Sequence, residues 1–197
     1  MAGCILVGGR SRRLGQPKAL LRLGQQKLLE YVVAALLRIY PSSQILLITP
    51  RPEEVAFLGL ACVHTEAKDK GPLAALIEAL RQTPDEHNLI VACDLPFLNS
   101  EVLALLLSRL PGQLAVVPEI GGYLEPLCAA YAKSSLPILE RQLGQGIFGL
   151  QRAVLQLDPL RLPEQTVRLL DPDLRSFFNV NTSEDLAQAR KLLIGRL

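Results

Sequence analysis

Histidine is scarce in this 197-residue sequence: its two residues, His64 and His87, lie far apart and in no recognisable motif. Histidine is the usual base beside a catalytic nucleophile and the commonest protein ligand of metal ions. Its scarcity argues against a histidine-dependent nucleophilic enzyme and against a zinc site.

Cysteine is also sparse, and no two of the four residues form a C-x-x-C pair. Three of them stand in apolar, strand-like runs, where cysteine usually behaves as a small hydrophobic side chain. The N-terminal segment has no basic stretch ahead of its apolar residues, which is the wrong order for a secretory signal. We therefore expect a cytoplasmic protein with neither disulfides nor a cysteine metal site.

Long apolar runs are absent, and the longest, Tyr31–Leu37, is far shorter than the ~20 residues of a membrane-spanning helix. The net charge is only +2, whereas dedicated nucleic-acid binders usually carry a basic excess over the whole domain. We expect neither membrane insertion nor nucleic-acid binding. Residues 1–30 nevertheless hold six basic residues against the single acid Glu30, which indicates a local anion site.

Apolar residues are abundant, at 49% of the chain, and form short runs that alternate with longer amphipathic stretches. The runs ILV, ILLI and LIVAC are apolar throughout, as expected of parallel strands that helices cover on both faces. Such alternation predicts βαβ units. We expect an α/β fold in a single domain over residues 1–197, with a mostly parallel sheet flanked by helices.

The expected elements are clearest in the first half of the chain. Helices are predicted near residues 27–39 and 72–82, and another from a cap at Asn99 or Ser100 to Leu110. The second half is less regular. There we expect strands within 113–119 and 124–132, a helix over 134–143, a turn-rich stretch over 160–170 and a helix over 183–193, capped by Thr182 or Ser183.

Two adjacent glycines, Gly8 and Gly9, stand in the segment LVGGRSRRLGQPK, residues 6–18, which follows a predicted strand. Glycine lets the backbone turn sharply and bring its amide N–H groups close to an anion, and Arg13 and Lys18 can offset phosphate charge. The spacing fits a triphosphate. The segment matches neither G-x-x-x-x-G-K-[ST] nor G-x-G-x-x-G, and a solvated basic turn is the alternative interpretation.

Asp94 directly follows the apolar strand predicted over residues 89–93. A carboxylate at the carboxyl end of a central parallel strand points into the crevice where open α/β sheets bind ligands. Mg2+ prefers such an oxygen ligand together with substrate phosphates. The alternative is a turn-forming aspartate ahead of Leu95 and Pro96.

Asn179 and Asn181 alternate with Val180, so in an extended segment both amides project from one face while Val180 packs on the other. Two turn-forming asparagines before a helix cap are the alternative. Glu125 lies at a glycine-rich approach to a strand, and the sequence leaves open whether it is structural or lines a cleft.

Five segments together resemble the molybdenum cofactor guanylyltransferases, a branch of the nucleotidyltransferases: LVGGRSRRLGQPKALL, GPLAAL (71–76), CDLPF (93–97), EPLCAAY (125–131) and FNVNTSEDL (178–186). They extend from the first predicted strand to the last predicted helix, so the resemblance covers essentially the whole chain. It implies a Rossmann-like, mostly parallel sheet of the nucleotide-diphospho-sugar transferase type. The implied reaction transfers GMP from GTP to molybdenum-molybdopterin, forming the molybdopterin guanine dinucleotide, with release of pyrophosphate and a requirement for Mg2+.

The resemblance also implies roles for single residues. Lys18, Arg13 and Asp94 would be catalytic, since an ionised phosphate that attacks in line needs charge stabilisation rather than a general base. Asp94 would hold Mg2+, and Asn179 and Asn181 would lie on the pterin side. The implied nucleotide-binding residues are Leu6, Val7, Gly8, Gly9, Lys18, Glu66 and Asp94. Residues up to about 112 would then bind the nucleotide, and residues from about 113 the acceptor.

The sequence departs from the family pattern on the guanine side. The family's asparagine after the second strand falls near Ile48 and Thr49, and its aspartate before GPL falls near Thr65 or Glu66. Glu66 can still accept a hydrogen bond from a guanine N–H. The family pattern therefore does not by itself determine the base specificity.

Three alternatives accompany this interpretation: a cytidylyltransferase of the same cofactor, a transferase that forms sugar nucleotides, and a nucleotide-binding partner domain without turnover. The last is disfavoured because a silent domain has no need of both Lys18 and Asp94. The expected partners are GTP and molybdenum-molybdopterin. Transient contact with cofactor-biosynthesis proteins or target-enzyme chaperones is a further possibility.

Overall fold

A continuous eight-stranded sheet forms the centre of the molecule, whose computed structural model describes residues 1–8, 17–65 and 71–194. Seven strands follow the order β10-β7-β9-β6-β1-β4-β5, and β8 pairs with β7. In this sheet β9 and β8 run opposite to the other six strands. The strands are β1 (Ala2–Leu6), β4 (Ile45–Thr49), β5 (Ala61–His64), β6 (His87–Ala92), β7 (Ala115–Ile120), β8 (Tyr123–Leu124), β9 (Cys128–Ala132) and β10 (Leu160–Pro163).

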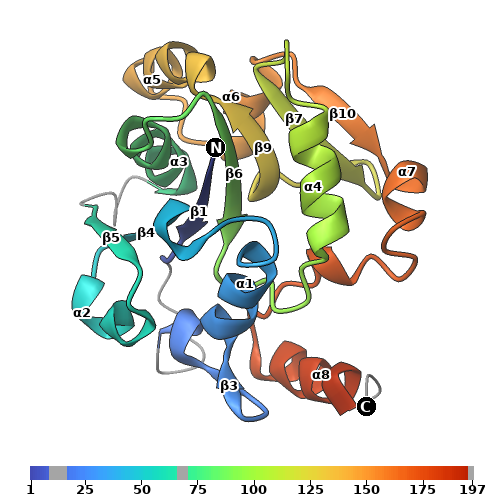
Figure 1. Cartoon of the computed structure of the whole chain (residues 1–197). Coiled ribbons are helices and arrows are strands. Elements are labelled where there is room, and N and C mark those ends of the chain that lie inside the picture. Colours follow the sequence, from blue (N-terminus) through green and yellow to red (C-terminus); the bar gives the residue numbers. More distant parts are fainter. Residues whose placement is uncertain (9–16, 66–70, 195–197) are drawn as a thin grey trace.

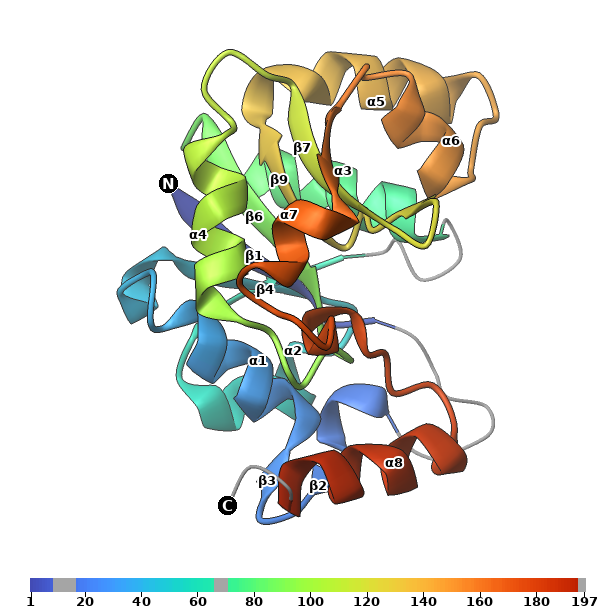
Figure 2. The same ribbon diagram turned by 90° about the vertical axis from the view of Figure 1, so that its right-hand side faces the viewer.

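Helices cover both faces of this sheet (Figures 1 and 2). One face packs against α1 (Leu28–Leu36), α2 (Pro52–Val55), α4 (Ser100–Ser108) and α7 (Glu164–Arg168). The other packs against α3 (Gly71–Gln82), α5 (Leu136–Gly144) and α6 (Leu150–Leu155). The mixed, mostly parallel α/β sandwich predicted from the sequence is confirmed.

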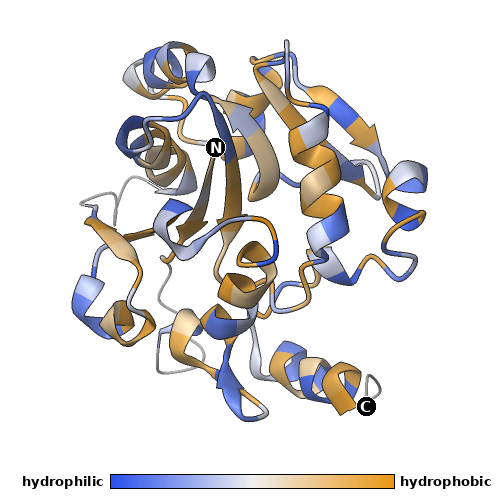
Figure 3. Cartoon of the chain, viewed as in Figure 1, coloured by the Kyte–Doolittle hydropathy of each residue, from blue (hydrophilic) through white to orange (hydrophobic). Residues whose placement is uncertain are grey.

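The two hydrophobic cores explain why the central strands are apolar throughout. Along β1, Ile5 faces the core under α1 and α4, whereas Cys4 and Leu6 face the core under α3. Both faces of such a strand leave water, so alternation of polar and apolar residues is lost. Figure 3 shows this as hydrophobic colouring along most of β1 and β6.

A third, smaller core lies below the sheet and involves the last helix, α8 (Ser183–Ile194). Leu186 and Ala189 of α8 pack with Leu23 and Leu28, beside a hairpin of β2 (Arg22–Leu23) and β3 (Gln26–Lys27). Val180, just before α8, is fully buried in this core. Figures 1 and 2 both place α8 next to this hairpin, so the C-terminal part of the chain returns to its N-terminal part.

The turn-rich stretch predicted over residues 160–170 is wrong: the structure has β10 and α7 there. Pro163 ends the strand and serves as the N-cap residue of the helix, which explains the turn-like composition. Each element buries one residue, Leu162 or Val167, so neither shows a hydrophobic period. The short elements α2, α6 and the β2–β3 hairpin were also not predicted.

The other predicted elements lie close to where the sequence placed them. Asn99 is the N-cap of α4, where its side chain accepts from the backbone N–H of Glu101 at 2.8 Å. Among the described residues, no helix is both long and apolar enough to cross a bilayer.

Candidate active site

The ends of the central strands come level at one edge of the sheet. Leu6 of β1 pairs in register with Ile48 of β4 on one side and Ala92 of β6 on the other. The residues that follow these strands therefore meet at one edge, as expected for ligand binding in an open α/β sheet. A cavity of about 1010 Å³ opens there, lined among others by Val7, Gly8, Pro50, Thr65, Asp94 and Asn179.

An ion pair stands in the middle of this edge. The Nζ atom of Lys18 donates to Oδ2 of Asp94 at 2.9 Å, and the two side chains are only 16% and 14% exposed. Lys18 begins a single turn of 3-10 helix, Lys18–Leu20, which the backbone N–H of Leu21 closes on its carbonyl. Lys18 Nζ also donates to the side-chain oxygen of Asn181. The ammonium group of Lys18 therefore joins two residues, Asp94 and Asn181, that are far from it in the sequence.

A backbone hydrogen bond joins the segment that carries Asn179 and Asn181 to the residues that follow β6. The backbone N–H of Val180 donates to the carbonyl of Asp94 at 3.0 Å. Because Val180 packs into the third core, the residues on either side of it face the opposite way, toward the cavity and Lys18. The predicted alternation about Val180 is confirmed in this arrangement.

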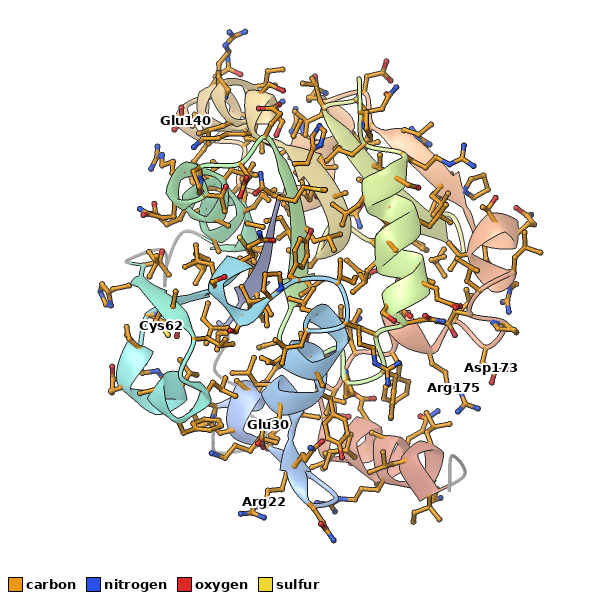
Figure 4. All side chains as sticks on the ribbon, viewed as in Figure 1. Arg22, Glu30, Cys62, Glu140, Asp173 and Arg175 are labelled. Carbon is orange, nitrogen blue, oxygen red and sulfur yellow. The ribbon has the colours of Figure 1, made fainter. Side chains whose placement is uncertain are left out.

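A buried carboxylate shapes the approach to this segment. Asp171, 7% exposed, accepts from the backbone N–H groups of Arg175 and Ser176 at 3.1 and 2.8 Å. The Ser176 hydroxyl accepts from the backbone of Asn99, whose side chain donates to the carbonyl of Leu170. The Asp173–Arg175 ion pair lies at the outer surface of the molecule (Figure 4).

A capping box holds the other end of the segment. One oxygen of Asp185 accepts from the backbone N–H groups of Asn181 and Thr182, both at 2.9 Å, and the Thr182 hydroxyl accepts from the Asp185 N–H. These hydrogen bonds hold the pKa of the Asp185 carboxyl below its ordinary value, the one from Asn181 most strongly. Thr182 is thus the cap of α8, one of the two residues predicted for that role.

The donor set fits a single magnesium ion bridging to phosphates. Oδ1 of Asp94 is buried and has no hydrogen-bond partner among the described residues, while Oδ2 is held by Lys18. No cluster of three or more His, Cys, Asp or Glu side chains is present in the parts of the chain that the structure describes. Mg2+ commonly binds through one or two carboxylates plus substrate phosphates, and Asp94 could supply one such carboxylate.

Cys93 lies next to Asp94 but is chemically quiet. Burial, and secondarily the Asp94 charge, raises the pKa of its thiol to about 12. A thiol with this pKa is protonated near neutral pH and is a poor nucleophile. Cys93 therefore supplies no thiolate nucleophile beside Asp94.

Comparison with known proteins agrees with this geometry. The family model for the MobA-like NTP transferase domain matches residues 3–166. The chain belongs to this family. A probable molybdenum cofactor guanylyltransferase of Pelotomaculum thermopropionicum is 33% identical over 95% of this chain and 91% of its own length. A molybdenum cofactor guanylyltransferase of Desulfosudis oleivorans is also 33% identical, over 96% of this chain and 94% of its own length.

Solved structures extend the comparison. Molybdopterin-guanine dinucleotide biosynthesis protein A of Archaeoglobus fulgidus superposes with a TM-score of 0.83 at 31% identity, covering 99% of this chain and 100% of its own. The 2-C-methyl-D-erythritol 4-phosphate cytidylyltransferase of Thermus thermophilus, at 17% identity, reaches 0.70 over 98% of each chain and shares the fold. The predicted resemblance and the nucleotide-diphospho-sugar transferase fold are both confirmed, and the chain is a nucleotidyltransferase.

The structure brings most of the predicted site residues of this MobA-like domain together. The cavity is lined by Leu6, Val7, Gly8, Asp94 and Asn179, and Lys18 and Asn181 contact Asp94 or each other beside it. Glu125 also lines the cavity, which settles the choice between a structural and a cleft-lining position. Gly9, Arg13 and Glu66 lie outside the described residues.

Several cavity residues of the MobA-like domain were not predicted as site residues, and those with large polar side chains include Arg51, Tyr123 and Gln151. Arg51 follows β4 and forms an ion pair with Glu54 in the next turn. Gln151 is brought to the cavity by the short helix α6, which the sequence did not predict. No local signal marks these residues, because their position depends on how neighbouring loops fold back over the sheet edge.

Proposed function

We propose that this nucleotidyltransferase transfers GMP from GTP to molybdenum-molybdopterin, forming the molybdopterin guanine dinucleotide and releasing pyrophosphate. The observation that carries the proposal is the cluster of Lys18, Asp94 and Asn181 at the centre of the sheet edge. The names of the relatives at 33% identity over most of the chain support the choice of substrates.

The acceptor phosphate is ionised at neutral pH, so its oxygen can attack the α-phosphorus without a general base. The chain must then hold the two substrates in line and offset the negative charge that grows on the α-phosphate and on leaving pyrophosphate. Lys18 supplies a partly buried positive charge for this purpose, and the side-chain oxygen of Asn181 orients the ammonium group by accepting a hydrogen bond from it. The absence of histidine motifs is no handicap for such chemistry.

Asp94 would hold Mg2+ through its unpartnered Oδ1, and the ion would supply additional neutralisation of phosphate charge. Lys18 would then share its interactions between Oδ2 of Asp94 and a substrate phosphate. Arg13 is proposed as a further phosphate-binding cation.

The first half of the chain is proposed to bind the nucleotide. Gly8 offers an amide without a Cβ atom, and a Cβ built there would meet no atom within 4 Å, so a phosphate can approach closely. Toward β4 and β5 the cavity is lined by Ile48, Pro50 and Thr65, where we propose that the base lies with Glu66. Residues from about 113 onward, including Asn179 and Asn181, would then receive the acceptor.

The proposal is tested with the purified chain, molybdenum-molybdopterin and each of GTP, CTP, ATP and UTP, with and without Mg2+. We expect Mg2+-dependent pyrophosphate release with GTP, accompanied by formation of the guanine dinucleotide. Faster turnover with CTP would make the protein a cytidylyltransferase of the same cofactor. Nucleotide binding without any pyrophosphate release would contradict an enzymatic role.

A further inference from the structure

The cavity has a second end, on the other side of Asp94 from the proposed nucleotide site. Along the sheet edge the strand order places Asp94 after β6, with β1, β4 and β5 on one side and β9 and β7 on the other. Tyr123 and Glu125, between β7 and β9, and Gln151 of α6 line this second end. A substrate whose phosphate reaches Lys18 from here has the rest of its structure beside these side chains.

Glu125 lines the cavity, and none of the described residues donates a hydrogen bond to its carboxylate. Its backbone N–H donates to the carbonyl of Pro118 at 2.8 Å and its carbonyl accepts from Cys128 at 3.1 Å, so the backbone is satisfied. Within residues 1–8, 17–65 and 71–194, no hydrogen bond or ion pair reaches its side-chain oxygens. Desolvation by burial raises the pKa of Glu125 above its ordinary value. The half-buried carboxylate is therefore available to accept hydrogen bonds from a ligand in the cavity.

The backbone around Glu125 is held from three directions. The Gln151 side chain donates to the carbonyl of Leu124, and the Tyr131 hydroxyl donates to that of Pro126 at 2.8 Å. The carbonyl of Leu127 accepts from Ala92 at the end of β6. Glu125 is therefore carried on a rigid corner, which is the condition for selective recognition by a single side chain.

We infer that Glu125 selects the acceptor by accepting hydrogen bonds from two adjacent N–H donors of a 2-amino-4-oxopyrimidine ring, such as the ring N–H and amino group of a pterin. The inference rests on the proposed function. Two carboxylate oxygens match two parallel donors, and such charge-assisted pairs are stronger than neutral ones. The Tyr123 side chain, 74% exposed at the same end, offers an aromatic surface for a fused ring.

The first experiment uses the Glu125→Gln variant, which keeps the size of the side chain and removes one acceptor. We expect KM for molybdenum-molybdopterin to rise at least about tenfold, the usual loss when a charge-assisted hydrogen bond is removed. KM for GTP should stay unchanged. Glu101→Gln, an exposed glutamate in the first turn of α4, is the matched control for the loss of one negative charge and should leave both values unchanged.

The second experiment needs no turnover. It measures binding of 6-hydroxymethylpterin and of lumazine, which carries a 2-oxo group in place of the 2-amino group, by their fluorescence. The parent chain should prefer the pterin, and Glu125→Gln should shift the preference toward lumazine, because a glutamine amide can donate to the 2-oxo group. An unchanged preference between the two ligands would overturn the inference.

The two proposals fail in different ways. If the parent chain forms no dinucleotide from GTP and molybdenum-molybdopterin, the proposed function is wrong. If the parent chain is active and Glu125→Gln retains the parent KM for the acceptor, the function stands and the role of Glu125 is wrong. An increase in KM for GTP alone would place the carboxylate at the guanine base and also overturn the inference.

Discussion

Residues 2–110 and residues 115–194 build one sheet in different ways. In the first region the strands β1, β4, β5 and β6 are parallel neighbours, and their ends deliver Val7, Thr65 and Asp94 to one edge. In the second region β7, β8 and β9 pair antiparallel. The chain then returns to the first region, where Asn181 accepts a hydrogen bond from Lys18. The first region supplies the charged pair, and the second fixes its geometry and lines the remaining cavity.

This difference indicates that the two regions have different roles in substrate binding. The parallel strands present backbone groups and one carboxylate, which suit phosphates and a metal ion regardless of what is attached to them. The later region presents side chains from loops and short helices, which suit recognition of a particular acceptor. Substitutions in the two regions should therefore change different kinetic constants.

The largest effect is expected for Asp94→Asn in the first region. The change removes the negative charge that pairs with Lys18 and that would hold Mg2+, so Mg2+-dependent pyrophosphate release should fall by about 10³-fold, at the upper end of losses for a single electrostatic catalytic group. Asp173→Asn, with a side chain 66% exposed in a surface ion pair, is the matched control and should retain parent activity. Full Mg2+-dependent turnover by Asp94→Asn would refute the metal assignment.

The substitution Asn181→Ala tests the role of the second region. This change removes the oxygen that orients the Lys18 ammonium group, and hydrogen bonds to charged groups contribute about 1.5–3 kcal/mol. We expect kcat to fall by roughly 10- to 100-fold, following the same energies. The values of kcat are measured by steady-state kinetics in which each substrate is varied in turn.

Asn179→Ala is the matched variant, because Asn179 lines the cavity without contacting Lys18. It should raise KM for the acceptor more than it lowers kcat. Equal effects of Asn179→Ala and Asn181→Ala on kcat would show that the two asparagines act together. They would contradict the proposal that Asn181 orients Lys18 while Asn179 binds the acceptor.

The sequence predicts the first region better than the second for a physical reason. The buried strands 45–49 and 87–92 and the capped helix after Asn99 are specified by local patterns that burial on both faces and end-capping impose. In the second region α6, β10 and α7 are short and bury few side chains, so their structure depends on contacts made elsewhere.

The candidate site divides in the same way. Lys18, Asp94, Asn179 and Asn181 could be predicted because they follow strands or stand in recognisable segments. The contact of Asn181 with Lys18 could not, because residues 163 positions apart meet only through the packing of α8 on the β2–β3 hairpin. Gln151 was missed because its helix was missed.

The third core, which joins the two regions, can be weakened at Val180. Val180→Ala removes two buried methyl groups and should lower the free energy of unfolding by about 2 kcal/mol, measured by urea denaturation. Leu169→Ala is the control, since Leu169 is 82% exposed, and its effect should stay within about 0.5 kcal/mol. If Val180→Ala were as stable as the parent, the third core would not bind the regions together.

The smallest expected effect concerns the cap of α8 and depends on pH. The pKa of Asp185 is lowered in the folded protein, so its ionised form stabilises the fold above the unfolded-state pKa of about 4. This contribution is lost as pH falls through the lower, folded-state pKa. Asp185→Ala should therefore cost about 1 kcal/mol at pH 7, typical of a helix cap, and progressively less below pH 4. Urea unfolding of both proteins at pH 7 and pH 3.5 tests this, and a difference that grew on acidification would contradict the assignment of Asp185 as an ionised cap.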